Sequence, residues 1–142
     1  MNGQAASRPT LGIVAAILVA VIAAVHLQQY IDFIGEVPTI GVLFLLNAAG
    51  GAGLAVALLS RDRLLRLLAA VGSIGLAAGS LVSIVIALES SLFGYSEPTL
   101  RLPIVIAIVA EVIAIPVLAL LARDELRSGA ARERALNPQR QL

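Results

Sequence analysis

Residues 102–121 read LPIVIAIVAEVIAIPVLALL, an apolar run in which Glu111 is the only charged residue. An α-helix rises 1.5 Å per residue, so about 20 residues cross the roughly 30 Å of hydrocarbon in a bilayer. A carboxylate at this depth costs roughly 2.5–3.5 kcal/mol on insertion scales, and it normally faces a protein interior, a partner or a water-filled cavity. The stretch therefore predicts a transmembrane helix with one deep polar centre.

The composition of the whole chain is typical of a membrane protein. Of its 142 residues 59% are hydrophobic and 13% are charged, whereas soluble domains have about 25% charged residues. Lipid offers the backbone no hydrogen-bond partners, so the apolar segments are predicted to be helices. Short links between them favour antiparallel neighbours. We predict one all-α domain over residues 1–142, a four-transmembrane-helix antiparallel bundle with helices at about 11–30, 39–59, 64–88 and 102–121.

The arginines predict the orientation of this bundle. All ten basic residues are Arg, and nine of them lie before the first segment, around the link at 60–63 or in the tail at 123–142. The positive-inside rule then places both termini in the cytoplasm, and the arginine-only, alanine-rich composition is typical of a bacterial protein. We expect a multi-pass protein of the bacterial plasma membrane, whose tail extends the fourth helix by about two or three turns and frays near Asn137. A cleaved signal peptide is the alternative for the first helix, and it would leave the sides of the loops unchanged.

The two halves of the chain share short sequences at the edges of their helices. EVPTI at 36–40 precedes the second segment and EPTL at 97–100 precedes the fourth, while SRD at 60–62 matches ARD at 122–124. A duplication of helix pairs would relate the halves by an axis along the membrane normal. Boundary chemistry is the alternative, because Pro and Thr favour helix starts and Arg-Asp suits a cytoplasmic end. Both interpretations are open.

Polar side chains are predicted to gather in the outer half of the bundle. Asn47 and Glu111 lie about 12–14 Å below the outer boundary at 1.5 Å per residue, and His26 lies nearer the surface with Gln29 and Tyr30 on the same helix face. The inner half has almost no polar residues, so we expect a polar cup above an apolar plug. The link at 90–96 either lies on the membrane surface or caps the cup. The candidate ligand or proton site comprises Glu111, Asn47, His26, Tyr30, Ser80 and Ser83.

Each candidate has a structural alternative. Glu111 could relay protons or bind a cation, or it could be a protonated hydrogen-bond donor to Asn47 or Ser80 that fixes helix register. The Asn47 amide could join two helices or contact a ligand. His26 and Tyr30 could form a ligand-binding face, or they could be interfacial side chains with an apolar body and a wet tip.

Small residues predict where the helices approach closely. A stripe on the third helix includes one G-x-x-x-G motif, and further glycines follow Asn47 on the second helix. Packing between these two helices is the ordinary interpretation, and a dimer face is the alternative. Pro116 is predicted to kink the fourth helix one turn beyond Glu111. The predicted packing positions are Gly50, Gly51, Gly72, Gly75 and Gly79.

Several classes of function are disfavoured by residue types. The chain has no Cys and His only at position 26, which excludes disulfides, a bis-His haem site within one chain and a multi-His zinc site. We find no nucleotide loop or nucleophile–base pair, so we predict no enzyme, cofactor, metal or nucleic acid. The leading hypothesis is a non-enzymatic membrane protein, an accessory subunit or a homo-oligomer with lipid or a larger membrane complex as partner. The alternative is a binding or transport module for a proton, cation or small ligand in the cup, and a single-His haem or quinone site is the least favoured.

Two motifs carry a family resemblance. The end of the first helix, HLQQY at 26–30, and the second helix, GVLFLLN at 41–47, resemble small uncharacterised four-helix integral membrane proteins of actinobacteria, which share an HLxxY-like end and an IGxLFLLN-like helix. The DoxX-like group is similar more weakly. The resemblance covers roughly the first 60 residues and implies a fold and a cellular setting, without a reaction.

Overall fold

The chain folds into four long helices, seen in a computed structural model that describes residues 7–136, with the side chains of 7–9 and 132–135 left out. All four are long and apolar enough to cross a membrane, which confirms the all-α prediction and the four predicted spans. The predictions for residues 137–142 lie outside the described residues. The elements are α1 (Ser7–Gln29), the π-helix η1 (Tyr30–Ile34), α2 (Ile40–Leu58), α3 (Arg63–Glu89) and α4 (Leu102–Leu136).

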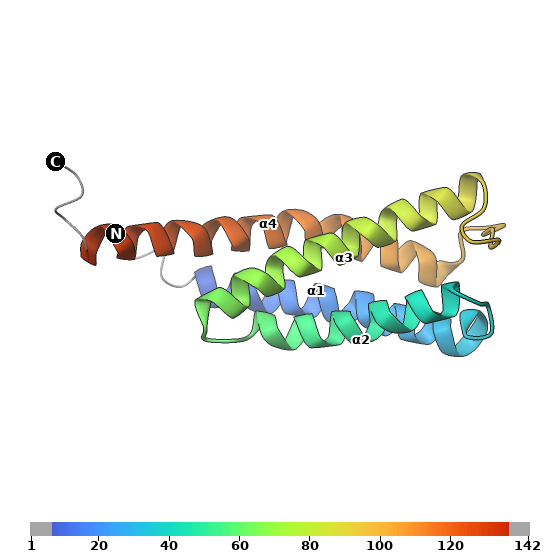
Figure 1. Cartoon of the computed structure of the whole chain (residues 1–142), viewed down its shortest axis with the longest axis horizontal. Helices are drawn as coiled ribbons and strands as arrows, with labels where there is room; N and C mark the ends of the chain where they lie inside the picture. Colours follow the sequence, from blue (N-terminus) through green and yellow to red (C-terminus); the bar gives the residue numbers. More distant parts are fainter. Residues whose placement is uncertain (1–6, 137–142) are drawn as a thin grey trace.

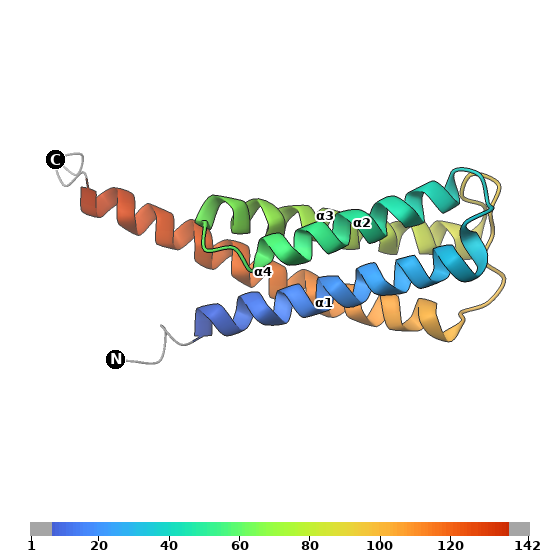
Figure 2. The same cartoon turned by 90° about the horizontal axis from the view of Figure 1, so that it is seen from below.

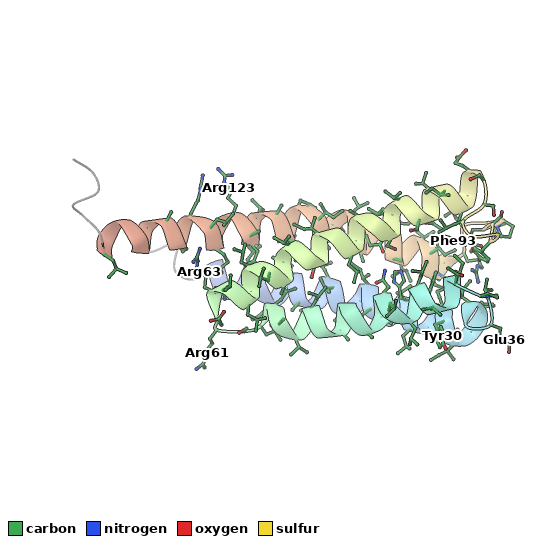
Figure 3. The ribbon with its side chains drawn as sticks, in the orientation of Figure 1. Tyr30, Glu36, Arg61, Arg63, Phe93 and Arg123 are labelled. Carbon is green, nitrogen blue, oxygen red and sulfur yellow. The ribbon has the colours of Figure 1, made fainter. Side chains whose placement is uncertain are left out.

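The helices lie along one long axis and successive helices run in opposite directions (Figure 1). Each helix packs on two neighbours, in the order α1, α2, α3, α4 and back to α1. The link between α2 and α3 lies at one end, which we call the arginine end, and η1 and residues 90–101 lie at the other, which we call the loop end. Arg61, Arg63 and Arg123 mark the first end, and Tyr30 and Phe93 the second (Figure 3).

Helix α4 is longer than the apolar run that predicted it. It continues through Pro116 without interruption and ends at Leu136. Figure 2 shows its last turns running past the start of α3 at the arginine end. The predicted extension beyond residue 121 is therefore present, and it is longer than the two or three turns expected.

A half-buried ion pair fastens α3 to α4 at the arginine end. The carboxylate of Glu125 pairs with Arg66, and the backbone carbonyl of Glu125 accepts a 2.6 Å hydrogen bond from Arg63 Nε. Asp62 caps the start of α3 by accepting a 2.7 Å hydrogen bond from the Leu65 amide, the usual role of Asp at a helix N-terminus. The short link between α2 and α3 is thus held by side chains at its end.

The apolar core occupies the middle of the bundle and its arginine end. Most of its residues are alanines, whose small side chains let the helices approach closely, and larger residues such as Val19, Ile22 and Leu118 fill the remaining space. The core members on α4 reach from Ala110 to Ala122, beside and beyond Glu111. This packing corresponds to the apolar plug that the sequence predicted.

The predicted packing glycines fall into two groups. A Cβ on Gly51 would lie 3.0 Å from the Ala23 Cβ, and one on Gly72 would lie 3.1 Å from Leu54 Cδ2, so these positions do bring helices together. Gly50 faces Leu76 at an ordinary 3.7 Å. No described atom lies within 4 Å of a Cβ on Gly75 or Gly79, because α2 and α3 diverge from their link toward the loop end (Figure 1).

Candidate functional site

A cavity of about 460 Å³ lies between α2 and α3 in the loop-end half of the bundle. Its walls include Phe44 and Asn47 from α2 and Ser80 from α3. The exposed members of its lining, such as Leu46 (62% exposed) and Gly79, belong to these same two helices, so the cavity opens on the side of the bundle between them. Its volume lies in the usual range for small-molecule sites, about 300–1,000 Å³.

A smaller recess of about 50 Å³ adjoins this cavity and reaches α4. The two spaces share part of their walls, including His26, Gln29 and Ser80. Glu111 lines the recess and does not line the larger cavity. The recess has room for one or two water-sized groups, at about 30 Å³ each. Helices α1, α3 and α4 therefore meet around a small space whose wall contains the side chains of His26, Gln29, Ser80 and Glu111 among apolar residues.

The hydrogen bonds of His26 fix its tautomer. Its Nδ1 lies 2.9 Å from the Ile22 carbonyl oxygen, which can only accept, so Nδ1 carries the proton. In the neutral ring Nε2 is then an acceptor, and it accepts a hydrogen bond from the Ser80 hydroxyl at 3.2 Å. The ring also lies against Phe44, with the ring centroids 5.1 Å apart. His26 is thus a buried, fully paired side chain that ties α1 to α3.

Glu111 is the most deeply buried acid of the described residues, with 1% of its surface exposed. Among the described residues its Oε1 has no hydrogen-bond partner. The Ser80 hydroxyl also faces this carboxyl, but it has one proton, which His26 Nε2 accepts. The carboxyl therefore points into the recess with at least one oxygen unsatisfied by the protein.

The other predicted site residues take different positions. Asn47 lines the larger cavity, and its Oδ1 is buried without a partner in the described chain, so it does not bond to Glu111. Ser83 lines the same cavity and donates its hydroxyl to the Gly79 carbonyl at 2.8 Å. Tyr30 belongs to the linings of neither described cavity.

The helical form of the chain changes at Tyr30. Helix α1 gives way at this residue to the π-helix η1, in which the Gly35 amide donates to the Tyr30 carbonyl at 2.8 Å, five residues away. A π turn holds more residues than an α turn, so the i, i+4 spacing no longer applies to the residues that follow Tyr30. Gln29, the last residue of α1, remains on the inner side and is buried.

The loop between α3 and α4 covers the cavity at the loop end of the bundle. Phe93 and Gly94 have φ values of 51° and 84°, as in the tight turn that joins paired strands, and Leu92 and Tyr95 exchange backbone hydrogen bonds of 2.8 and 3.0 Å. The Glu97 amide then donates to the Ala87 carbonyl at 2.9 Å, which folds the loop back on α3. Tyr95 and Glu97 line the cavity, so the loop caps it, one of the two positions expected for it.

A buried carboxylate holds this cap in place. Glu97 is 5% exposed and accepts hydrogen bonds from the Tyr95 hydroxyl at 2.6 Å and from Arg101 Nη2 at 2.9 Å. The Arg101 guanidinium also lies 4.7 Å from the centre of the Phe33 ring in η1, within cation–π range. Arg101, the only arginine placed by the sequence on the outer side, is therefore paired and joins the two loops.

Burial and the neighbouring Glu97 carboxylate raise the pKa of Tyr95 from 10.0 to about 12. The folded state thus holds this proton more tightly than the unfolded state, so its stability is expected to fall as pH rises from 10 to 12. In Tyr30→Phe, where Tyr95 is the last tyrosine, the phenolate absorbance should rise with a midpoint near pH 12. Adding Glu97→Gln should lower that midpoint toward 10, whereas adding the exposed Glu36→Gln should not. Equal midpoints in all three proteins would contradict the assignment.

Sequence reasoning missed four residues of this site. Gln29 was recognised only as a neighbour of His26, although its Oε1 is buried without a partner in the described chain. Tyr95 and Glu97 were recognised only as parts of a loop, and Arg101 only as a positive charge on the predicted outer side. Their contacts with one another were not predicted. The spacing of Glu97 and Arg101, four residues apart and opposite in charge, was the available signal.

No three His, Cys, Asp or Glu side chains come together as a metal site in the part of the chain that the structure describes. Comparison with protein-family models, curated proteins and solved structures finds no match to this chain. The resemblance to small actinobacterial four-helix proteins therefore stays a prediction, and the function has to be argued from the site itself.

Proposed function

We propose that this chain is a multi-pass membrane protein that binds a small amphiphilic molecule between α2 and α3. The observation that supports this most directly is the cavity of about 460 Å³, mainly apolar along the two helices and polar at its inner wall and its cap. A largely apolar pocket with a few convergent polar groups is the usual form of a small-molecule site. Because the opening lies on the side of the bundle, the molecule would enter from the lipid.

The proposed setting is a bacterial plasma membrane with both termini in the cytoplasm. Its support is the distribution of arginines, since the arginine end carries Arg61, Arg63 and Arg123 and the loop end carries Arg101. Arg101 is one of ten arginines and the other nine lie in the segments assigned to the cytoplasmic side, so it weakens the asymmetry little. The site would then lie in the outer half of the membrane.

The accessory-subunit or homo-oligomer hypothesis is the second candidate. Its support is the open face at Gly75 and Gly79, where a helix of a second copy could approach closely. A helix seated there would cover the opening of the cavity, so helix association and ligand entry would exclude each other at this face. The variant Gly79→Leu distinguishes the two functions.

Gly79→Leu is expected to abolish ligand binding without unfolding the protein. Gly79 lines the cavity and a Cβ there meets no described atom within 4 Å, so the added side chain enters the space without a clash. His26 is the only histidine, so its ¹⁵N signals in lipid nanodiscs report on this site alone. In the wild-type protein nonanol or nonylamine should shift them saturably, and in Gly79→Leu neither should.

Gly53→Leu is the matched control. Gly53 is an exposed glycine of α2 that also has no described atom within 4 Å of its Cβ, and it lines neither described cavity. Binding should be unchanged in this variant. If neither probe shifts His26 in the wild-type protein, the binding function is wrong. If Gly79→Leu also dissolves a wild-type oligomer, the homo-oligomer hypothesis takes precedence.

A further inference from the structure

The recess beside Glu111 has an excess of hydrogen-bond acceptors. Glu111 Oε1 and Gln29 Oε1 are both buried and unpaired among the described residues, and the two residues are 1% and 2% exposed. Both side chains line the recess. A buried oxygen without a donor is unfavourable, so a bound group that supplies N–H or O–H donors would be stabilised there.

Two donors around the recess, the His26 ring N–H and the Ser80 hydroxyl, are already in use. The His26 Nδ1–H group donates a hydrogen bond to the Ile22 carbonyl oxygen. The Ser80 hydroxyl donates to His26 Nε2 and is therefore occupied. Arg101, the cation of the cap, is paired with Glu97. A group that brings its own donors to Glu111 is therefore favoured, and a carboxylate favours a donor with positive charge.

The shapes of the two spaces restrict the ligand further. The recess of about 50 Å³ accepts a head group of one or two water-sized units, and the adjoining cavity of about 460 Å³ accepts a larger apolar body. The described residues bring no third acid, histidine or cysteine to Glu111, as a conventional metal site would require. Phe44, which lines both spaces, adds an aromatic wall that can favour a cation.

We propose that the ligand is a protonated primary amine on an apolar body. Its ammonium group lies in the recess and donates to Glu111 and Gln29, and its apolar part lies between α2 and α3. This inference rests on the proposed binding function and names the class of ligand. In this proposal the ammonium group of the ligand neutralises the Glu111 carboxylate inside the membrane.

The test compares three probes that share one apolar chain, namely nonylamine, nonanol and nonyltrimethylammonium. Each is titrated into nanodiscs containing the full chain, with the ¹⁵N signals of His26 as the readout. Nonylamine is expected to bind at least tenfold more tightly than nonanol, a difference of about 1.4 kcal/mol. Nonyltrimethylammonium, which has no N–H and a larger head, is expected to give no saturable shift.

Two variants assign the preference to Glu111. Glu111→Gln should reduce the affinity for nonylamine to that for nonanol, and Glu36→Gln, an exposed carboxylate at the same end, should leave it unchanged. The comparison of probes on the wild-type protein stands even if Glu111→Gln does not fold. The proposal of an amine ligand would be contradicted if nonylamine and nonanol bound equally well, or if potassium ions shifted the His26 signals as nonylamine does. The proposed binding function would remain in either case.

Discussion

Glu97→Ala is expected to lower the free energy of unfolding by about 3 kcal/mol, the lower end of the range for breaking a buried charge pair. The lower end applies because the Arg101 side chain is 29% exposed and regains some water. The substitution removes the acceptor of Tyr95 and Arg101 and leaves two donors at the cap without a partner. Chemical unfolding of detergent-solubilised protein, followed by circular dichroism, measures the loss.

Glu89→Ala is the control for this result, because Glu89 ends α3 at the same end of the bundle and is exposed. Its effect should stay within about 0.5 kcal/mol, as for surface substitutions elsewhere. Equal stability of the two variants would mean that Glu97 does not hold the cap. The cap also closes the cavity, so under the proposed binding function Glu97→Ala should weaken the binding of nonylamine.

The helices were predictable because the membrane imposes length and apolarity on each of them. Residues 102–121 alone indicated a span, and their continuation to Leu136 followed from the helix-forming residues of the tail. The burial of Glu111 was predictable from the cost of a carboxyl group in lipid, and the side chain is 1% exposed. These predictions rest on the length and apolar composition of each segment, which can be read directly from the sequence.

The contents of the site were predictable only in part. His26, Ser80 and Glu111 do meet around the recess, whereas Tyr30, the first residue of η1, does not line it. No apolar pattern in the sequence signals the π turn that begins at this residue. The cap depends on a fold of residues 90–101 that is set by the positive φ of Phe93 and by contacts with other elements, which a sequence does not show.

The glycines show why spacing is weaker evidence than surroundings. Gly75 and Gly79 have the G-x-x-x-G spacing that favours close packing, but they line the opening of a cavity. Gly51 lies outside that motif, and its backbone lies directly against Ala23 of α1. The motif allows another helix to approach closely, but whether one does so depends on where the neighbouring helix lies. Apolar packing at the arginine end thus supports a more open, polar loop end.

Gly51→Leu is expected to cost about 3 kcal/mol relative to Gly53→Leu, the upper end of the usual range for overpacking. A Cβ on Gly51 would lie 3.0 Å from the Ala23 Cβ and 3.5 Å from the Ala23 Cα, atoms that move only if α1 moves. Gly53 gains the same side chain in open space, so both variants share the gain in helix propensity of up to about 1 kcal/mol. Unfolding of the two variants in the same detergent gives the difference. Equal stabilities would show that α1 and α2 are not in close contact at Gly51, and the alanine-lined core would then need another explanation.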